Sequence, residues 1–227
     1  RRGKEKLQEV KMEKEILVSP SILSGDFTNI ASETEKVKDC GADWIHCDVM
    51  DGVFVPNITF GQKMIRDIKK AAQLPLDVHL MITEPIRYTE EFAEAGADFI
   101  TVHIEACKDV GKTLETIKKC GVKAGLSVKP GTPVERVKEF SELLDLLLIM
   151  SVEPGFSGQK FIPSALEKTE KARGFLKRDV IIEVDGGVNP ENAAEIIKRG
   201  ADALVMGNAF FKAADPAEVV RRVKGIR

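Results

Sequence analysis

The 227-residue chain lacks the marks of a secreted, membrane-spanning or nucleic-acid-binding protein. Its four cysteines are far apart and form no C-x-x-C pair, so a disulfide framework is not indicated. No apolar run approaches the roughly 18 residues of a membrane span, and the longest, around Leu143–Met150, is interrupted by Asp145. The 34 basic residues nearly balance the 36 acidic ones, which leaves no electrostatic case for nucleic acid or an anionic membrane. We expect a cytoplasmic protein that acts on a small molecule.

The amino-terminal segment differs from the rest of the chain. Its first fourteen residues are rich in charge and lack the apolar stretch of a secretory signal. We expect residues 1–15 to be an extension, disordered or non-native, with Met12 as a candidate first residue. Residues 16–227 are expected to form one catalytic domain, because neither a linker nor a low-complexity segment divides them.

Short apolar or β-branched runs alternate along the chain with helical patterns that carry charge on one face, which is typical of βαβ units. Eight strands are predicted, at Ile16–Ser21, Trp44–Val49, Leu76–Met81, Phe99–His103, Lys123–Leu126, Leu146–Met150, Val180–Val184 and Ala203–Met206. The tripeptide Gly-Ala-Asp occurs three times between a helical pattern and a strand, beginning at Gly41, Gly96 and Gly200. Glycine favours the left-handed residue that ends a helix. This repeated punctuation predicts a (β/α)8 TIM barrel.

The competing architecture is a doubly wound open sheet with a nucleotide site. Such a sheet normally has a G-x-G-x-x-G turn after its first strand. The corresponding segment here, Ser19–Gly25, has no such turn, so the barrel is favoured.

A candidate metal site begins at residues 46–51, which read His-Cys-Asp-Val-Met-Asp. Alternate side chains of a strand share a face, so His46, Asp48 and Met50 are expected to point the same way. In a TIM barrel the active site forms at the carboxyl ends of the strands. His79 and Asp185 lie at two other such ends. Two imidazoles and two carboxylates suit zinc, iron(II), manganese or cobalt.

The third histidine, His103, ends a predicted strand close to Glu105. We interpret it as a structural group in the barrel interior or behind the ligands, and not as a ligand.

Three glycine-containing loops indicate a phosphate site. Successive glycines let a backbone approach an anion and aim N–H groups at it. The loops after strands 7 and 8 form the usual phosphate site of such barrels, and the loop after strand 6 can close over a substrate. The candidate residues are Gly186 and Gly187, Gly207 and Asn208, and Gly155, Phe156, Ser157 and Gly158.

Three methionines are also predicted to lie at the strand ends, where a substrate would bind. Met50, Met81 and Met150 all fall at predicted strand ends. Methionine is usually core filler, but apolar thioethers beside a reacting carbon would keep water from protonating a carbanion.

The chain resembles the ribulose-phosphate 3-epimerase family from about Val18 to Phe211. The matching motifs are Ser19–Leu23, Ala42–Gly52, Phe54–Gly61, Val78–Met81, Lys129–Thr132, Met150–Phe156 and Glu183–Gly187. The resemblance implies interconversion of D-ribulose 5-phosphate and D-xylulose 5-phosphate in the pentose phosphate pathway or the Calvin cycle.

By motif position, the resemblance implies that His46, Asp48, His79 and Asp185 bind one divalent metal ion, with zinc favoured. It also implies that Asp48 and Asp185 exchange protons with the substrate carbon through a metal-stabilised enediolate. We expect Asp48 to accept the proton of ribulose 5-phosphate and Asp185 to donate one to the opposite face. The substrate contacts are expected to be Ser21 and His79, the three methionines and the glycine loops.

Two departures and three alternatives accompany this prediction. Many family members have glycine at the position of Ser157 and serine at that of Asn208. The alternatives are a 3-epimerase of a hexulose 6-phosphate such as allulose 6-phosphate, a non-catalytic phosphate-binding barrel, and the related decarboxylases and hexulose-phosphate synthases. That last group is marked by Asp-x-Lys-x-x-Asp, where this chain has His46-x-Asp48-x-x-Asp51. We also expect a homo-oligomer.

Overall fold

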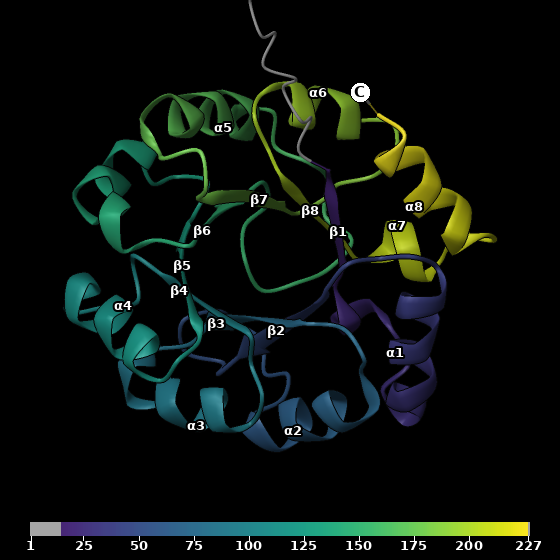
Figure 1. Cartoon of the computed structure of the whole chain (residues 1–227), viewed down its shortest axis with the longest axis horizontal. Coiled ribbons are helices and arrows are strands. Elements are labelled where there is room, and N and C mark those ends of the chain that lie inside the picture. The colour runs from purple at the N-terminus through teal and green to yellow at the C-terminus, as the bar shows by residue number, and fades with distance from the viewer. Residues whose placement is uncertain (1–14, 227) are drawn as a thin grey trace, which may run out of the picture.

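Eight parallel strands form a nearly closed barrel inside a ring of helices in the computed structural model, which describes residues 15–226 (Figure 1). The strands are β1 (Leu17–Pro20), β2 (Ile45–Met50), β3 (Leu76–Met81), β4 (Phe99–His103), β5 (Lys123–Val128), β6 (Leu146–Met150), β7 (Ile181–Asp185) and β8 (Ala203–Met206). From β2 to β8 each strand pairs with the next one in the chain, and β8 pairs with β1. At the seam between β1 and β2, Ser21 and His46 form a parallel bridge. The predicted (β/α)8 barrel is confirmed, and the open-sheet alternative is excluded.

The helices that cover the barrel are short. They are α1 (Ile30–Asp39), α2 (Gln62–Ala71), α3 (Thr89–Glu94), α4 (Val110–Lys119), α5 (Ser164–Phe175), α6 (Ala193–Lys198), α7 (Asn208–Phe211) and α8 (Pro216–Lys224). Four 3-10 helices join them, at Ile22–Ser24, Phe27–Asn29, Pro85–Arg87 and Val134–Leu143. The last of these takes the place of an α-helix between β5 and β6. Among residues 15–226, no helix has the length and apolar character needed to cross a membrane.

Both faces of the barrel strands are buried, and strand parity decides what each side chain contacts. In β6, Leu147 and Ile149 belong to the core between the barrel and its helices. Their neighbours Leu146, Leu148 and Met150 belong to a second apolar cluster that also contains Trp44 and Ala203. Trp44 and residues of β6, β7 and β8 therefore fill the barrel interior, which keeps water away from the buried polar groups nearer its carboxyl end.

Four predicted strands have the observed bounds, and the others differ by one or two residues at one or both ends. One difference concerns the site, since Asp185 is the last residue of β7 and not the residue after it. The predicted extension at residues 1–15 lies, apart from Glu15, outside the described residues.

Repeated aspartates explain the Gly-Ala-Asp tripeptides. Asp98 precedes β4, and its carboxylate accepts a hydrogen bond from the backbone N–H of Leu76 at the start of β3. Asp43 does the same for Val18 at 2.8 Å, and Asp202 for Ile182 at 2.9 Å. The glycine two residues earlier has a positive φ, 107° at Gly96, as expected of a residue that ends a helix. The repeat thus ties the start of one strand to the start of its neighbour.

Removing one of these carboxylates should destabilise the fold. Asp98→Ala leaves the buried Leu76 N–H without its acceptor, and we expect it to lower the free energy of unfolding by about 1–3 kcal/mol. Asp67→Ala is the matched control, because both aspartates pair with a lysine of α2 and their side chains are equally exposed, but it is Asp98 that accepts the backbone N–H of a strand. It should change stability by less than about 0.5 kcal/mol. Equal losses in urea unfolding would contradict this account.

Candidate active site

A cavity of about 250 Å³ opens where the strands end, which is the size of site that suits a small metabolite. Most of the substrate contacts predicted from the sequence line it. These are Ser21, Met50, Met81, Met150, Gly155, Phe156, Ser157, Gly158, Gly186, Gly187, Gly207 and Asn208, together with Asp48 and Asp185. Residues from β1 to β3 thus meet the loops that follow β6, β7 and β8 around one space.

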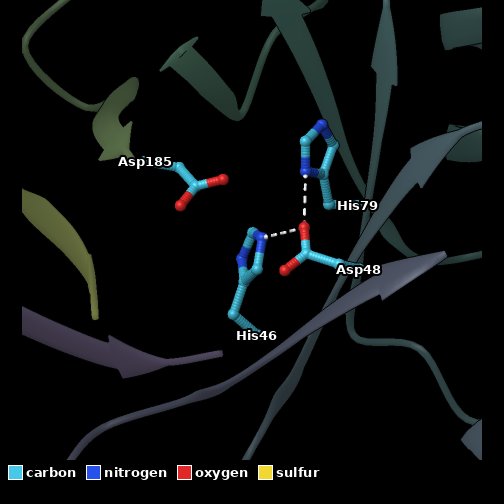
Figure 2. Close-up of side chains that lie close together, drawn as sticks. All are labelled: His46, Asp48, His79 and Asp185. Carbon is cyan, nitrogen blue, oxygen red and sulfur yellow. Dashed lines mark hydrogen bonds and ion pairs between the residues drawn. The ribbon is translucent and has the colours of Figure 1, made fainter. Parts of the chain in front are cut away.

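Four potential metal ligands gather beside this cavity. One donor atom each of His46, Asp48, His79 and Asp185 lies within 4.8 Å of the others. In Figure 2, both imidazoles contact the same carboxylate oxygen of Asp48, while Asp185 faces this group from β7. His46 Nε2 is 3.2 Å and His79 Nδ1 is 3.1 Å from that oxygen. The other oxygen of Asp48 accepts a hydrogen bond from Ser21 Oγ at 2.6 Å.

His46 lies between two carboxylates. Its Nδ1 is 2.5 Å from a carboxylate oxygen of Asp77, and its Nε2 faces Asp48. Burial opposes a charge on the ring, but Asp48 and Asp77 raise the pKa of His46 well above its usual value, which favours a proton on each ring nitrogen in the metal-free protein. A divalent cation beside Asp48 would take the place of the proton on Nε2 and leave the other proton on Nδ1 for Asp77. The buried donor set therefore fits a divalent metal ion.

The structure adds two buried carboxylates that the sequence analysis missed. Asp77 and Glu183 form a second cluster with His46, again with donor atoms within 4.8 Å. The signal was available, because Asp77 precedes His79 and Glu183 precedes Asp185 by two positions, which places each pair on one strand face. Burial, together with the negative charge of Asp77, raises the pKa of Glu183 well above its usual value. Its surroundings therefore favour the protonated form of Glu183.

The two carboxylates that reach the cavity differ in proton affinity. Burial alone would raise the pKa of Asp48, but the charge of His46 and the hydrogen bonds of both histidines hold it well below its usual value. Burial and then the charge of Asp48 raise the pKa of Asp185 to about 6. Metal-free Asp48 is therefore ionised near pH 7, while Asp185 holds its proton more tightly.

The histidines lie behind the carboxylates. His46 and His79 are fully buried and are not among the residues that line the cavity. His79 Nδ1 is directed at Asp48, so His79 remains a candidate ligand, and it does not touch the cavity space where a substrate would lie. His103 lies behind His79, with 2.9 Å between their Nε2 atoms. His103 is therefore buried behind the candidate ligands, where the sequence analysis expected it.

The glycine loops are packed too closely for larger residues. A Cβ atom on Gly186 would lie 2.8 Å from the backbone nitrogen of Val152, and one on Gly187 would lie 2.4 Å from that of Phe161. Both glycines also have a positive φ. The loops after β6 and β7 therefore reach the cavity with backbone, as an anion site requires.

Comparison with known proteins gives a consistent result. A model described as "Ribulose-phosphate 3 epimerase family" matches residues 17–211. The chain is 48% identical to the ribulose-phosphate 3-epimerase of Bacillus subtilis, an alignment that covers 92% of this chain and 99% of that protein. It is 47% identical to the Synechocystis enzyme, covering 94% and 95%. The chloroplastic ribulose-5-phosphate-3-epimerase of Arabidopsis thaliana is 46% identical, with 92% and 76% covered.

Solved structures show the same fold at lower identity. A 3-hexulose-6-phosphate synthase superposes with a TM-score of 0.69 at 22% identity and covers 93% of this chain and 99% of its own. An orotidine 5'-phosphate decarboxylase from Pyrococcus horikoshii gives 0.66 at 17% identity, covering 92% and 97%. These similarities support the barrel and nothing finer.

The raised pKa of Asp185 predicts how stability depends on pH in the metal-free protein. An acid that binds its proton more tightly when folded contributes stability below its unfolded pKa of about 4, and this is lost as pH rises through its folded pKa. Relative to wild type, Asp185→Asn should gain up to about 3 kcal/mol in free energy of unfolding between pH 4 and pH 7. Urea unfolding across this range, with chelator present, measures the difference. Parallel profiles would contradict the assignment.

Proposed function

The chain belongs to the ribulose-phosphate 3-epimerase family and catalyses that isomerisation, and from this premise we propose which of its residues carry out the reaction. The substrate is a sugar phosphate of pentose phosphate metabolism. We propose that Asp48 and Asp185 are the two proton carriers. One observation carries this proposal: the two carboxylates come from β2 and β7, and both line the cavity at the centre of the barrel mouth.

Epimerisation needs a proton removed from one face of C3 and another added to the opposite face. The C3 hydrogen is acidic because it lies next to the C2 carbonyl, and its removal gives an enediolate. Asp48, ionised near neutral pH, suits the group that accepts the proton of ribulose 5-phosphate. Asp185, with its raised pKa, suits the group that donates to the other face. In the reverse direction the two roles exchange.

We further propose that His46, Asp48, His79 and Asp185 hold one divalent cation. Zinc is the first candidate, and iron(II), manganese and cobalt suit the same ligands. The ion would stabilise the negative charge that develops on the C2 and C3 oxygens. Ser21 orients Asp48 through the hydrogen bond to its second oxygen.

The remaining cavity residues are proposed to shape the environment of the reacting carbon and of the phosphate. Met50, Met81 and Met150 are buried at the cavity wall and present apolar thioethers, which limits water near the carbanion. Gly186, Gly187, Gly207 and the Gly155–Gly158 loop offer backbone N–H groups to the phosphate. The side-chain amide of Asn208 lies against Gly158, so it is placed to contribute as well.

The charge near the end of β2 does not support the chemistry of the decarboxylases and hexulose-phosphate synthases. The decarboxylase and hexulose-phosphate synthase group has a lysine in its Asp-x-Lys-x-x-Asp motif. This chain has Asp48 at that position, and Asp48 is surrounded by imidazoles and Ser21.

We propose a homo-oligomer in a reducing compartment such as the cytoplasm. Val53 and Ile58, in the segment after β2, are about three-quarters exposed, which is unusual for two large apolar side chains of one loop. All four cysteines are free thiols. Curated relatives include a form named chloroplastic and a form named cytoplasmic. Light scattering that gives the mass of one chain would contradict the oligomer.

The two proton carriers are distinguished by hydrogen exchange in D₂O. Asp185→Asn should exchange C3 of ribulose 5-phosphate with solvent through Asp48 but convert it to xylulose 5-phosphate about 10³-fold more slowly than wild type. Asp48→Asn should show the opposite preference and exchange only xylulose 5-phosphate. Mass spectrometry of each recovered sugar measures the exchange.

The control for these variants is Asp51→Asn, three residues after Asp48. Its carboxylate caps backbone N–H groups of Val53, Phe54 and Thr83 and does not line the cavity. It should alter turnover by less than about threefold. Near-normal epimerisation by Asp48→Asn would refute the assignment.

Removal of the cation should reduce both activity and stability. A ligand that binds only the folded protein raises its stability, so chelation should abolish turnover and lower the Tm of the wild type. Zinc or manganese should restore both. The variant in which His46 and His79 are both glutamine should have a Tm that chelator does not change. Full activity of rigorously metal-free protein would contradict the proposal.

A further inference from the structure

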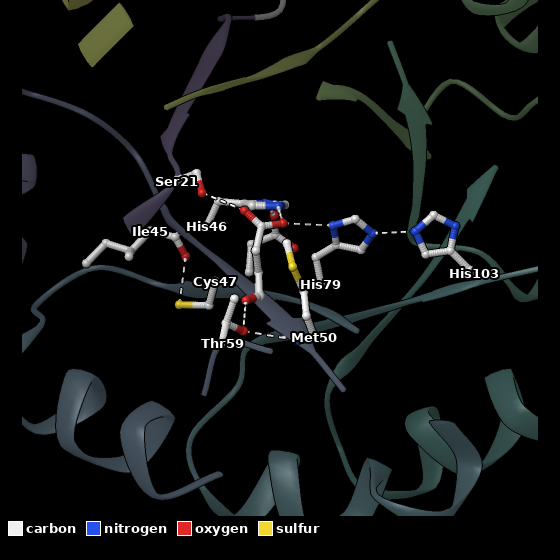
Figure 3. Close-up of polar contacts among 10 residues, drawn as sticks. Ser21, Ile45, His46, Cys47, Met50, Thr59, His79 and His103 are labelled. Atoms are coloured by element: carbon white, nitrogen blue, oxygen red, sulfur yellow. Dashed lines mark hydrogen bonds and ion pairs between the residues drawn. The ribbon is translucent and has the colours of Figure 1, made fainter. Parts of the chain in front are cut away.

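Behind the proposed metal site, a line of contacts runs from Asp48 to Glu105. His79 Nδ1 faces Asp48, His79 Nε2 faces His103 Nε2, and His103 Nδ1 lies 3.2 Å from Glu105. Figure 3 shows the contact between His79 and His103 in this line. Both histidines are fully buried, whereas Glu105 is only partly buried.

The carboxylate of Glu105 is held in place from its other side. Its Oε1 accepts a hydrogen bond from the backbone N–H of Lys129 at 2.9 Å and another from the hydroxyl of Thr132. The loop that supplies these donors is itself fixed, because Lys168 Nζ donates to the carbonyls of Lys129, Pro130 and Thr132. Glu105 is thus a carboxylate with a set direction.

When a cation is bound beside Asp48, the contacts from Glu105 to His79 allow only one placement of the ring protons. A carboxylate can only accept, so His103 must place its proton on Nδ1, facing Glu105. Neutral His103 then has a lone pair on Nε2, which requires that His79 Nε2 carry the proton between the two rings. The remaining nitrogen, His79 Nδ1, is left with a lone pair directed at the Asp48 end of the line.

We propose that Glu105 and His103 are positioning residues that fix the tautomer of His79, so that His79 binds the cation through Nδ1. This inference rests on the proposed metal site and adds two residues to it. His46 is set in the same way by Asp77, but with the opposite nitrogens, since its Nδ1 faces Asp77 and its Nε2 faces Asp48. The two imidazoles of one site are therefore expected to bind through different ring nitrogens.

The surroundings of His103 support this role. The ring of Phe54 lies 4.9 Å from that of His103, and Lys129 Nζ lies 3.9 Å from the centre of the Phe54 ring. Phe54 covers the imidazole and Lys129 covers Phe54, so water does not replace Glu105 as the partner of Nδ1. In a dry place, the direction of one hydrogen bond decides the tautomer.

The chain allows a direct test because it has only three histidines. Long-range ¹H–¹⁵N correlation spectra distinguish ring nitrogens that are protonated, unprotonated or metal-bound. In the zinc-loaded wild type we expect His103 to be protonated at Nδ1 only and His79 at Nε2 only. Binding of zinc should shift His79 Nδ1 and His46 Nε2. His103 protonated at Nε2, or zinc on Nε2 of His79, would overturn the inference.

Glu105→Gln should loosen the arrangement, because an amide presents a donor as well as an acceptor to His103. We expect a mixture of His103 tautomers and a loss of zinc affinity of about 10–100-fold, measured by chelator competition. Asp145→Asn is the control, since it replaces a carboxylate by an amide at the opposite end of the barrel. There Asp145 accepts a hydrogen bond from the backbone N–H of Ala124. Its zinc affinity should stay within about twofold of wild type.

Two further results keep the outcomes separate. Thr132→Val removes one donor to Glu105 but keeps the Lys129 N–H, so it should lower zinc affinity less than Glu105→Gln does. If Glu105→Gln does not fold, Thr132→Val tests the inference in its place, and wild-type zinc affinity with a single His103 tautomer in Thr132→Val would then refute it. Glu105→Gln that folds with wild-type zinc affinity and a single His103 tautomer would refute the positioning role. If wild-type protein bound no metal ion, the proposed metal site would fail, and the metal-free spectrum would still report the tautomer of His103.

Discussion

Carboxylates and imidazoles are buried together at the mouth of this barrel, so the ring nitrogens must be shared among them. His46 faces a carboxylate with each nitrogen, and the pair His79 and His103 makes three contacts between Asp48 and Glu105. Neutral rings of this pair carry two protons for those three contacts. A cation beside Asp48 would remove that shortage and would take the place of the proton on His46 Nε2. The same buried charge explains why Asp48 favours ionisation while Asp185, on β7, retains a proton more tightly. The two proposed proton carriers thus differ because of their neighbours.

The alternation of side chains along the strands brings these groups together. On β2, β3 and β7 an inward-facing polar residue near the carboxyl end follows, by two positions, a buried carboxylate or imidazole, as in Asp77-x-His79 and Glu183-x-Asp185. The seam between β1 and β2 brings Ser21 to Asp48. At the other end of the barrel, aspartates such as Asp98 fix strand starts and so fix the register that these positions require.

The fold and the four proposed ligands could be predicted from the sequence because both depend on local periodicity. Parity placed His46 and Asp48 on one face, and the strand ends placed His79 and Asp185 nearby. Asp77 and Glu183 obey the same rule, but a buried carboxylate was not expected beneath a ligand. The role of Glu105 depends on contacts with Lys129 and Thr132, more than twenty residues away, which no local pattern reveals. The substrate came from family resemblance, since geometry alone indicates only proton chemistry beside an anion site.

Anomalous diffraction from a crystal of zinc-loaded protein tests the central claim most directly. The account predicts one zinc peak within coordination distance of His46 Nε2, His79 Nδ1 and the carboxylates of Asp48 and Asp185. A peak between His46 Nδ1, Asp77 and Glu183, where the other buried cluster lies, would contradict it. So would coordination of zinc by Nε2 of His79, or the absence of any zinc at the mouth of the barrel.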